Sequence, residues 1–286
     1  MRINHDELLE GDPSTLEAAL RTLADEEPAD DRPDESSVEH EKEGLASLEV
    51  AAVAEERGLH VTRLLDSVIV CSDGSRDVAF RGFAGSTTSR IALAMCRSDA
   101  WVRRYLEPKG VPVAATRLVE QRRPTQALRA ADELGYPVAL RAAEDAFDSS
   151  TTVTGRAEFR KAWEWLRERE LEHRMQIIIE HPPNGLLCDV AVVAGLAVAV
   201  AVHDSANPLT DDPHNSATAR AVEVLGNLPK IDYASVRLAV EQADSGPSGV
   251  VVLGVDPLLQ AWAERPDRTE IARAVLEHEF GGTRDD

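Results

Sequence analysis

The chain has 286 residues, with 51 acidic and 31 basic side chains and a formal net charge of −20. Hydrophobic residues make up 43% of it, enough for a folded core, and a chain of this length has roughly two domains. So negative a chain repels phosphate backbones and anionic lipid, which excludes nucleic acid and membrane surfaces as its main partners.

The first 43 residues differ from the rest. Leucine and alanine recur at helical spacing between positions 16 and 23. Residues 25–43 are then almost wholly acidic and polar, which is typical of a flexible linker. We therefore predict that residues 1–43 form an acidic, flexible tail with a short helix, which either solubilises the protein or docks a partner.

Regular structure is expected from Gly44 onward. Residues 45–57 are amphipathic at helical spacing and end at Gly58, which is typical of a helix C-cap. A long helix is predicted from about Thr88 to Leu106. Between these two helices, alternating apolar residues predict strands over 60–65, 67–71 and 78–81.

The remainder alternates helices with strands and hairpins. Helices are predicted over 124–134, 155–172, 215–225 and 267–280. Strands are predicted over 136–141, 175–180, 235–240 and 249–255, and a hairpin over 187–204 that turns at Ala194-Gly195. This order favours an α+β fold over a simple doubly wound α/β sheet.

The cysteines and the N-terminus predict a cytoplasmic protein. Cys71, Cys96 and Cys188 are odd in number, far apart and in apolar contexts, so we expect buried free thiols in a reducing compartment. Residues 1–6 lack the basic and apolar runs of a signal peptide, and no stretch approaches the ~18 apolar residues of a membrane helix.

Common catalytic and phosphate-binding motifs are absent from the sequence. It contains no G-x-G-x-x-G, P-loop, G-x-S-x-G or H-E-x-x-H pattern. Residues 82–88 precede a predicted helix and are glycine-containing, but they lack the lysine of a P-loop, so a plain turn is the favoured interpretation. The eight histidines show no metal-ligand spacing.

Six segments in order carry a resemblance to a known family. The six segments span 54–61, 105–113, 127–140, 176–185, 188–202 and 232–257. The first three contain the runs Ala54-Glu55-Glu56-Arg57-Gly58, Gly110-Val111-Pro112-Val113 and Gly135-Tyr136-Pro137-Val138. Together they resemble the ATP-grasp ligases, in the branch of cyanophycin synthetase and the glutathione-synthesising enzymes. The resemblance implies a pre-ATP-grasp α/β unit over 44–107 and two α+β lobes over 108–286 that grip ATP.

The same resemblance implies ATP and Mg²⁺ as cofactors, yet most of the residues that would hold them are altered. The two phosphate-binding lysines of the family fall on Asp99 and Arg141, a charge reversal and a change of geometry. Only four lysines (Lys42, Lys109, Lys161 and Lys230) are present in the whole chain. The glycine-rich flap falls on residues 143–151, which contain three acids and no glycine.

The metal ligands implied by the family are also reduced. Its first aspartate falls on Arg237, and its glutamate and asparagine fall on Gly254 and Asp256. Asp256 is therefore the one candidate magnesium ligand, and a single carboxylate is a poor Mg²⁺ site. Glu180 falls on the acid that meets the adenine and ribose, so Arg141 and Glu180 are the candidate nucleotide-binding residues.

Two hypotheses follow. In the first, the chain is an ATP-grasp pseudoenzyme that serves as a binding or scaffold protein for a protein partner or a second copy, with no catalytic residues. In the second, it is an active, divergent carboxylate–amine or carboxylate–thiol ligase in which arginines replace the lysines. For single residues a plainer interpretation also stands: Glu180 as a strand-end acid, Asp256 as a turn former, and His203-Asp204 as a solvated strand end.

Overall fold

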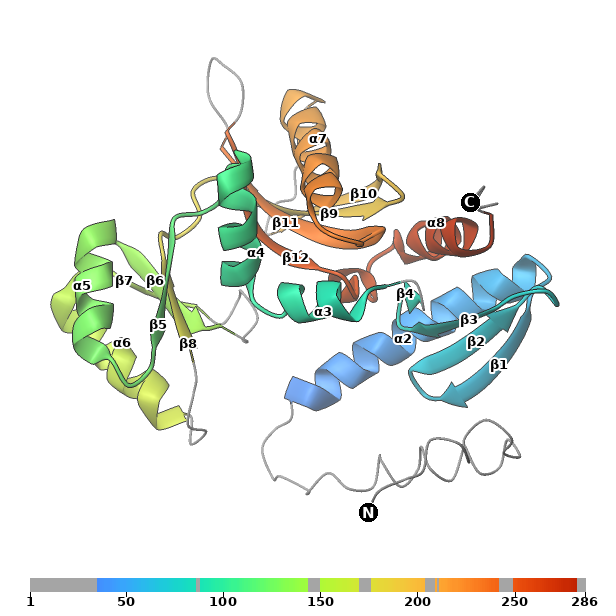
Figure 1. Cartoon of the computed structure of the whole chain (residues 1–286), viewed down its shortest axis with the longest axis horizontal. Coiled ribbons are helices and arrows are strands. Elements are labelled where there is room, and N and C mark those ends of the chain that lie inside the picture. The colour runs from blue at the N-terminus through green and yellow to red at the C-terminus, as the bar shows by residue number, and fades with distance from the viewer. Residues whose placement is uncertain are drawn as a thin grey trace.

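A computed structural model describes residues 35–85, 88–143, 150–169, 176–203, 209, 211–241 and 249–281. These residues form three four-stranded sheets, all with antiparallel neighbours, and helices that cover them (Figure 1). The mixed helix and sheet content confirms the predicted α+β class. Within the described residues, no helix has the length and apolar character needed to cross a membrane.

The N-terminal unit is a helix on a sheet. Helix α2 (Glu35–Glu56) packs on a meander of order β1-β2-β3-β4, and the C-terminal helix α8 (Arg268–Gly281) packs on α2 (Figure 1). Alternate residues of the inner strands face this helix, so Ile69, Cys71, Val78 and Phe80 are buried. The four strands are β1 (His60–Leu65), β2 (Val68–Ser72), β3 (Asp77–Arg81) and β4 (Ala84–Gly85).

Two predictions in this region need correction. The helix expected from Gly44 begins at Glu35, so residues 35–43 are not linker. Glutamate and lysine favour helices, and the buried Glu43 also pairs with Arg81 at 2.8 Å. The predicted helix over 88–106 is two helices, because Ser98 takes an extended conformation (φ −134°, ψ 120°) at the N-cap position of the second, where its side chain makes no capping hydrogen bond. The short helix predicted between positions 16 and 23 lies outside the described residues.

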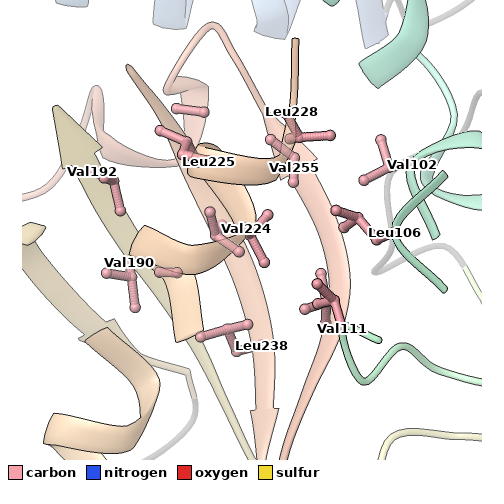
Figure 2. Close-up of a cluster of buried hydrophobic side chains, with 14 of the residues drawn as sticks. Val102, Leu106, Val111, Val190, Val192, Val224, Leu225, Leu228, Leu238 and Val255 are labelled. Carbon is pink, nitrogen blue, oxygen red and sulfur yellow. The ribbon is translucent and has the colours of Figure 1, made fainter. Parts of the chain in front are cut away.

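The central sheet has the order β10-β9-β11-β12, and its two faces pack on different layers. One face meets helices α7, α3 and α4, and Figure 2 shows side chains of this cluster, including Val190, Val224 and Leu106. The other face meets α8 and the N-terminal unit through Ala191, Val193 and Tyr233. The strands are β9 (Leu186–Val193), β10 (Leu196–Val202), β11 (Tyr233–Val240) and β12 (Val250–Asp256), and the helices are α3 (Arg90–Cys96), α4 (Asp99–Leu106) and α7 (Asp211–Asn227).

The third sheet has the order β5-β8-β6-β7 and carries helices α5 and α6 on one face. Its core includes Leu140, Ile177, Ile179, Phe159 and Trp163. The strands are β5 (Thr116–Glu120), β6 (Val138–Ala142), β7 (Thr151–Val153) and β8 (Gln176–Glu180), and the helices are α5 (Pro124–Leu134) and α6 (Arg156–Arg169). The short and largely polar β5 and β7 were not predicted from the sequence.

Helix α4 lies between the central sheet and the third sheet (Figure 1). It contacts both β12 and β5. Side chains on α4 can therefore reach both sheets, and this position builds the candidate site below.

The three cysteines are free and buried, as predicted. Burial raises the pKa of Cys96 and of Cys188 to about 12 and that of Cys71 to about 11, which keeps the thiols protonated.

Candidate functional site

Two of the predicted site residues lie on neighbouring strands of the third sheet. Arg141 is in β6 and Glu180 ends β8, and in the register of these strands Ala139 is opposite Glu180. Both side chains are 1% exposed. The Arg141 Nε donates a hydrogen bond to the Glu180 Oε1 at 3.2 Å. The structure thus brings the two candidate nucleotide-binding residues together, as an ion pair with each other.

The same arginine also binds Asp99, the residue at the other predicted lysine position. The Arg141 Nη2 donates to the Asp99 Oδ2 at 2.6 Å, and Asp99 is the first residue of α4. A guanidinium stays protonated at any pH at which a protein folds. Arg141 therefore holds one carboxylate from α4 and one from β8.

Arg103 completes this network and was missed by the sequence analysis. Its side chain is 2% exposed, its Nη1 donates to the Glu180 Oε2 and, at 2.7 Å, to the Thr116 Oγ1, and its Nε donates to the Leu253 carbonyl at 2.7 Å. One guanidinium thereby ties α4 to the third sheet and to the central sheet. A signal was present in the sequence: Arg103 follows Asp99 by four residues, one helical turn along the same face.

Gly254 and Asp99 are in close contact. A Cβ built on Gly254 would lie 2.7 Å from the Asp99 Cγ and closer still to its Oδ1, too near for any real side chain. Gly254 is opposite Arg237 in the register of β11 and β12. The Asp99 carboxylate therefore occupies the space that a side chain at position 254 would need.

A second charged cluster surrounds Asp189 in β9. The Asp189 carboxylate is 1% exposed and accepts hydrogen bonds from the His203 Nε2 at 2.6 Å and the Arg237 Nε at 3.0 Å, with the Arg265 Nη2 at 3.5 Å. Burial by itself would raise the pKa of Asp189, but the His203 hydrogen bond and the Arg237 charge outweigh it and hold the pKa below its ordinary value. Arg237, expected at a metal position, thus faces a carboxylate.

Asp256, the candidate magnesium ligand, is engaged with its own turn. Its Oδ1 accepts the Leu258 backbone N–H at 2.9 Å, and its Oδ2 accepts the Gln260 backbone N–H at 2.6 Å. Burial raises its pKa above the ordinary value, which favours the protonated form. These contacts are those of a turn-forming aspartate.

The residues present do not fit a magnesium ion. Both carboxylate oxygens of Asp256 already accept hydrogen bonds from backbone N–H groups. Gly254 has no side chain that could bind the ion, and the positive charge of Arg237 would repel it. Across the described part of the chain, no group of three His, Cys, Asp or Glu side chains is placed to hold a metal. Most of the predicted flap (residues 144–149) and Asp204 lie outside the described residues.

Replacing Asp189 with asparagine tests the charges of the second cluster. Because the folded-state pKa is depressed, the ionised carboxylate stabilises the fold above the unfolded pKa of about 3.9, and this stability is lost as the pH falls through the folded pKa. We expect Asp189→Asn to lower the free energy of unfolding by about 3 kcal/mol at pH 7, and the gap to wild type to shrink below about pH 4. Urea titrations across this range check it, and a gap that does not shrink would contradict the assignment.

Comparisons with known proteins define the fold. No protein-family model and no curated protein matches the sequence. Among solved structures, D-alanine–D-alanine ligase from Bacillus anthracis aligns over 68% of this chain and 70% of its own, with 12% identity and a TM-score of 0.51. The VanG D-Ala:D-Ser ligase from Enterococcus faecalis aligns over 66% and 63%, with 14% identity and a TM-score of 0.53.

The D-alanine–D-alanine ligase from Coxiella burnetii aligns over 65% of this chain, with 14% identity and a TM-score of 0.50. The chain spans less than two thirds of the length of this ligase and of VanG, at 57% and 63%. At these identities the likeness concerns the fold alone. The chain has the ATP-grasp fold, as the six sequence segments predicted.

Proposed function

We propose that this chain is an ATP-grasp-fold pseudoenzyme, which binds a partner and does not turn over ATP. The observation that carries the proposal is the pairing of Arg141 and Glu180. Both side chains are 1% exposed and are bound to each other. Arg141 also pairs with Asp99, and Glu180 also pairs with Arg103. A nucleotide would have to break these ion pairs in a buried environment, where an unpaired charge is costly.

The charges of the region support the same proposal. Phosphoryl transfer relies on cations placed around the transferred phosphate and on bound Mg²⁺. Here Asp99 brings a negative charge to a predicted lysine position, and the predicted metal positions carry Arg237 and Gly254. The proposed partner is a protein or a second copy of this chain, met in the cytoplasm, where the three free thiols would remain reduced.

Titration with Mg·ATP tests the proposal. We expect neither calorimetric heat nor a rise in melting temperature with 5 mM ATP and magnesium. A ligand present at about 100 times its Kd stabilises a fold by about 2.7 kcal/mol, so a nucleotide bound with a Kd near 50 µM would be obvious. The B. anthracis ligase, which has been solved complexed with ATP, is the positive control.

The alternative is an active, divergent carboxylate–amine or carboxylate–thiol ligase that uses ATP and a metal ion. Arg141 favours it, because this residue keeps a positive charge at a predicted phosphate-binding position. Tight, magnesium-dependent ATP binding, or release of ADP when carboxylate and amine substrates are added, would support this alternative and overturn the pseudoenzyme proposal.

A further inference from the structure

The outer face of helix α4 carries exposed aromatic side chains. Trp101 is 48% exposed and Tyr105 is 36% exposed. Because residues four positions apart share one face of a helix, the two rings lie in line along the solvent side of α4. The opposite face of the helix is buried and includes Val102, Arg103 and Leu106. The aromatic face is therefore turned away from the ion pairs of the candidate site.

Two cations lie against these rings. The Arg104 guanidinium is 6.0 Å from the centre of the Trp101 ring, and the Lys109 Nζ is 4.6 Å from the centre of the Tyr105 ring. Arg104 and Lys109 are themselves exposed. We call Trp101, Arg104, Tyr105 and Lys109 the outer stripe of α4. Tryptophan, tyrosine and arginine are the residue types that contribute most to protein–protein binding, so this stripe has the composition of a docking surface.

The outer stripe lies in a basic part of an acidic chain. Residues 89–123 contain eight basic and three acidic side chains, a formal charge of +5, whereas the rest of the chain carries −25. Arg103 and Asp99 belong to the buried network. The other seven basic residues of this range are exposed, against two exposed acids, Glu107 and Glu120. A positive surface of this kind favours an acidic partner.

An acidic segment that carries apolar residues is present in the chain itself. Residues 12–34, which precede the described part of the chain, contain eight acidic and two basic side chains. Leu16, Leu20 and Leu23 recur within them at helical spacing. The segment thus offers apolar groups to the two exposed rings and carboxylates to Arg104 and Lys109, and it complements the outer stripe in both respects.

The length of the chain lets this segment reach the outer stripe. Residue 35 is the first of α2, and in Figure 1 α2 begins below α3, the helix that precedes α4. Leu23 is 12 positions before Glu35, and an extended chain of that length spans roughly 40 Å. Covalent attachment gives such a segment an effective concentration of roughly millimolar. Attachment therefore favours this segment over a separate acidic chain or a second copy.

We propose that residues 12–34 dock on the outer stripe of α4 in the same chain, with the leucines on Trp101 and Tyr105 and the acids facing Arg104 and Lys109. The proposal goes beyond the pseudoenzyme proposal and does not rest on it, because it concerns the opposite face of α4 and holds whether or not ATP binds. It gives the acidic N-terminal segment an intramolecular role: it covers a basic surface that other acidic molecules would otherwise meet.

A spin label on the segment tests the docking in the full chain. The three native cysteines are buried, so a nitroxide can be attached selectively to Ser14→Cys. We expect the label to reduce the Trp101 indole N–H signal at least twofold, relative to the same sample after reduction of the nitroxide. In 1 M salt, where the Debye length is about 3 Å, the signal should recover. Trp101→Phe assigns this signal.

Trp165 is the internal control for random approach of the label. It is 44% exposed on α6, a helix of the third sheet, so its indole N–H signal should keep its intensity. Arg104→Gln with Lys109→Gln should restore most of the Trp101 signal. Arg160→Gln with Lys161→Gln, an exposed pair of the same charge on α6, should leave the loss of signal unchanged.

Changes in the segment itself keep the test valid if the α4 variant does not fold. Asp25→Asn, Glu26→Gln and Glu27→Gln alter none of the described residues and should also restore the Trp101 signal. The proposal is overturned if Trp101 keeps its signal, if Trp101 and Trp165 lose signal equally, or if the loss persists in 1 M salt. It is also overturned if the loss appears when labelled chains without isotope are mixed with unlabelled isotopic chains, because the segment then docks on a second copy.

Discussion

Replacing Glu180 with glutamine is expected to lower the free energy of unfolding by about 3–5 kcal/mol. The substitution keeps the shape of the side chain and removes its charge. Glu180 is the acid shared by Arg103 and Arg141, and all three side chains are at most 2% exposed. Without the Glu180 charge, Arg103 and Arg141 each lose a buried ion pair.

Chemical denaturation followed by circular dichroism measures this effect. Glu133→Gln is the matched control, because Glu133 pairs with Arg129 on the surface of α5 with side chains 51% and 81% exposed. Such an exposed pair contributes about 0–1 kcal/mol. If Glu180→Gln costs no more than Glu133→Gln, the buried network does not hold the two sheets and α4 together, and the main support for the pseudoenzyme proposal is lost.

Most of the fold could be predicted from the sequence because its signals are local. Helix α5 begins at Pro124 and ends before Gly135, and the hairpin of β9 and β10 turns at Ala194-Gly195, where both residues have positive φ. The two errors, one undivided helix over 88–106 and the missed strand β5, also have local causes. Ser98 divides a continuous amphipathic pattern, and the polar β5 pairs with β8 through backbone bonds that its side chains do not signal.

The candidate site could be predicted only in part. The resemblance placed Arg141 and Glu180 on strands that prove to be neighbours, but it gave no means to see that they pair with each other. Arg103 and Asp189 match no family position that the sequence analysis used. Arg103 contacts two residues that lie 77 and 150 positions away in the sequence, and Asp189 contacts Arg265, which lies 76 positions away. Local periodicity in a sequence cannot show contacts over such separations.

Substitution of Gly254 by alanine is expected to destabilise the protein by about 1–3 kcal/mol, because a methyl group there overlaps the Asp99 carboxylate. Either β12 shifts or Asp99 leaves its 2.6 Å contact with Arg141. Gly226→Ala is the control: this glycine is near the end of α7, with no atom within 4 Å of a built Cβ. Alanine should be neutral or stabilise there by up to about 1 kcal/mol.

A double-mutant cycle with Asp99→Gly separates steric overlap from any other effect of alanine. Asp99→Gly alone should be destabilising, because it leaves the buried Arg141 with one carboxylate partner fewer. In that background the three atoms nearest to a Cβ at position 254 are gone, so the added cost of Gly254→Ala should fall to nearly zero, a coupling energy of about 1–3 kcal/mol. Additive costs would mean that the two residues do not compete for one space. Strong coupling would mean that a side chain at position 254 and the ion pair of Asp99 with Arg141 exclude each other.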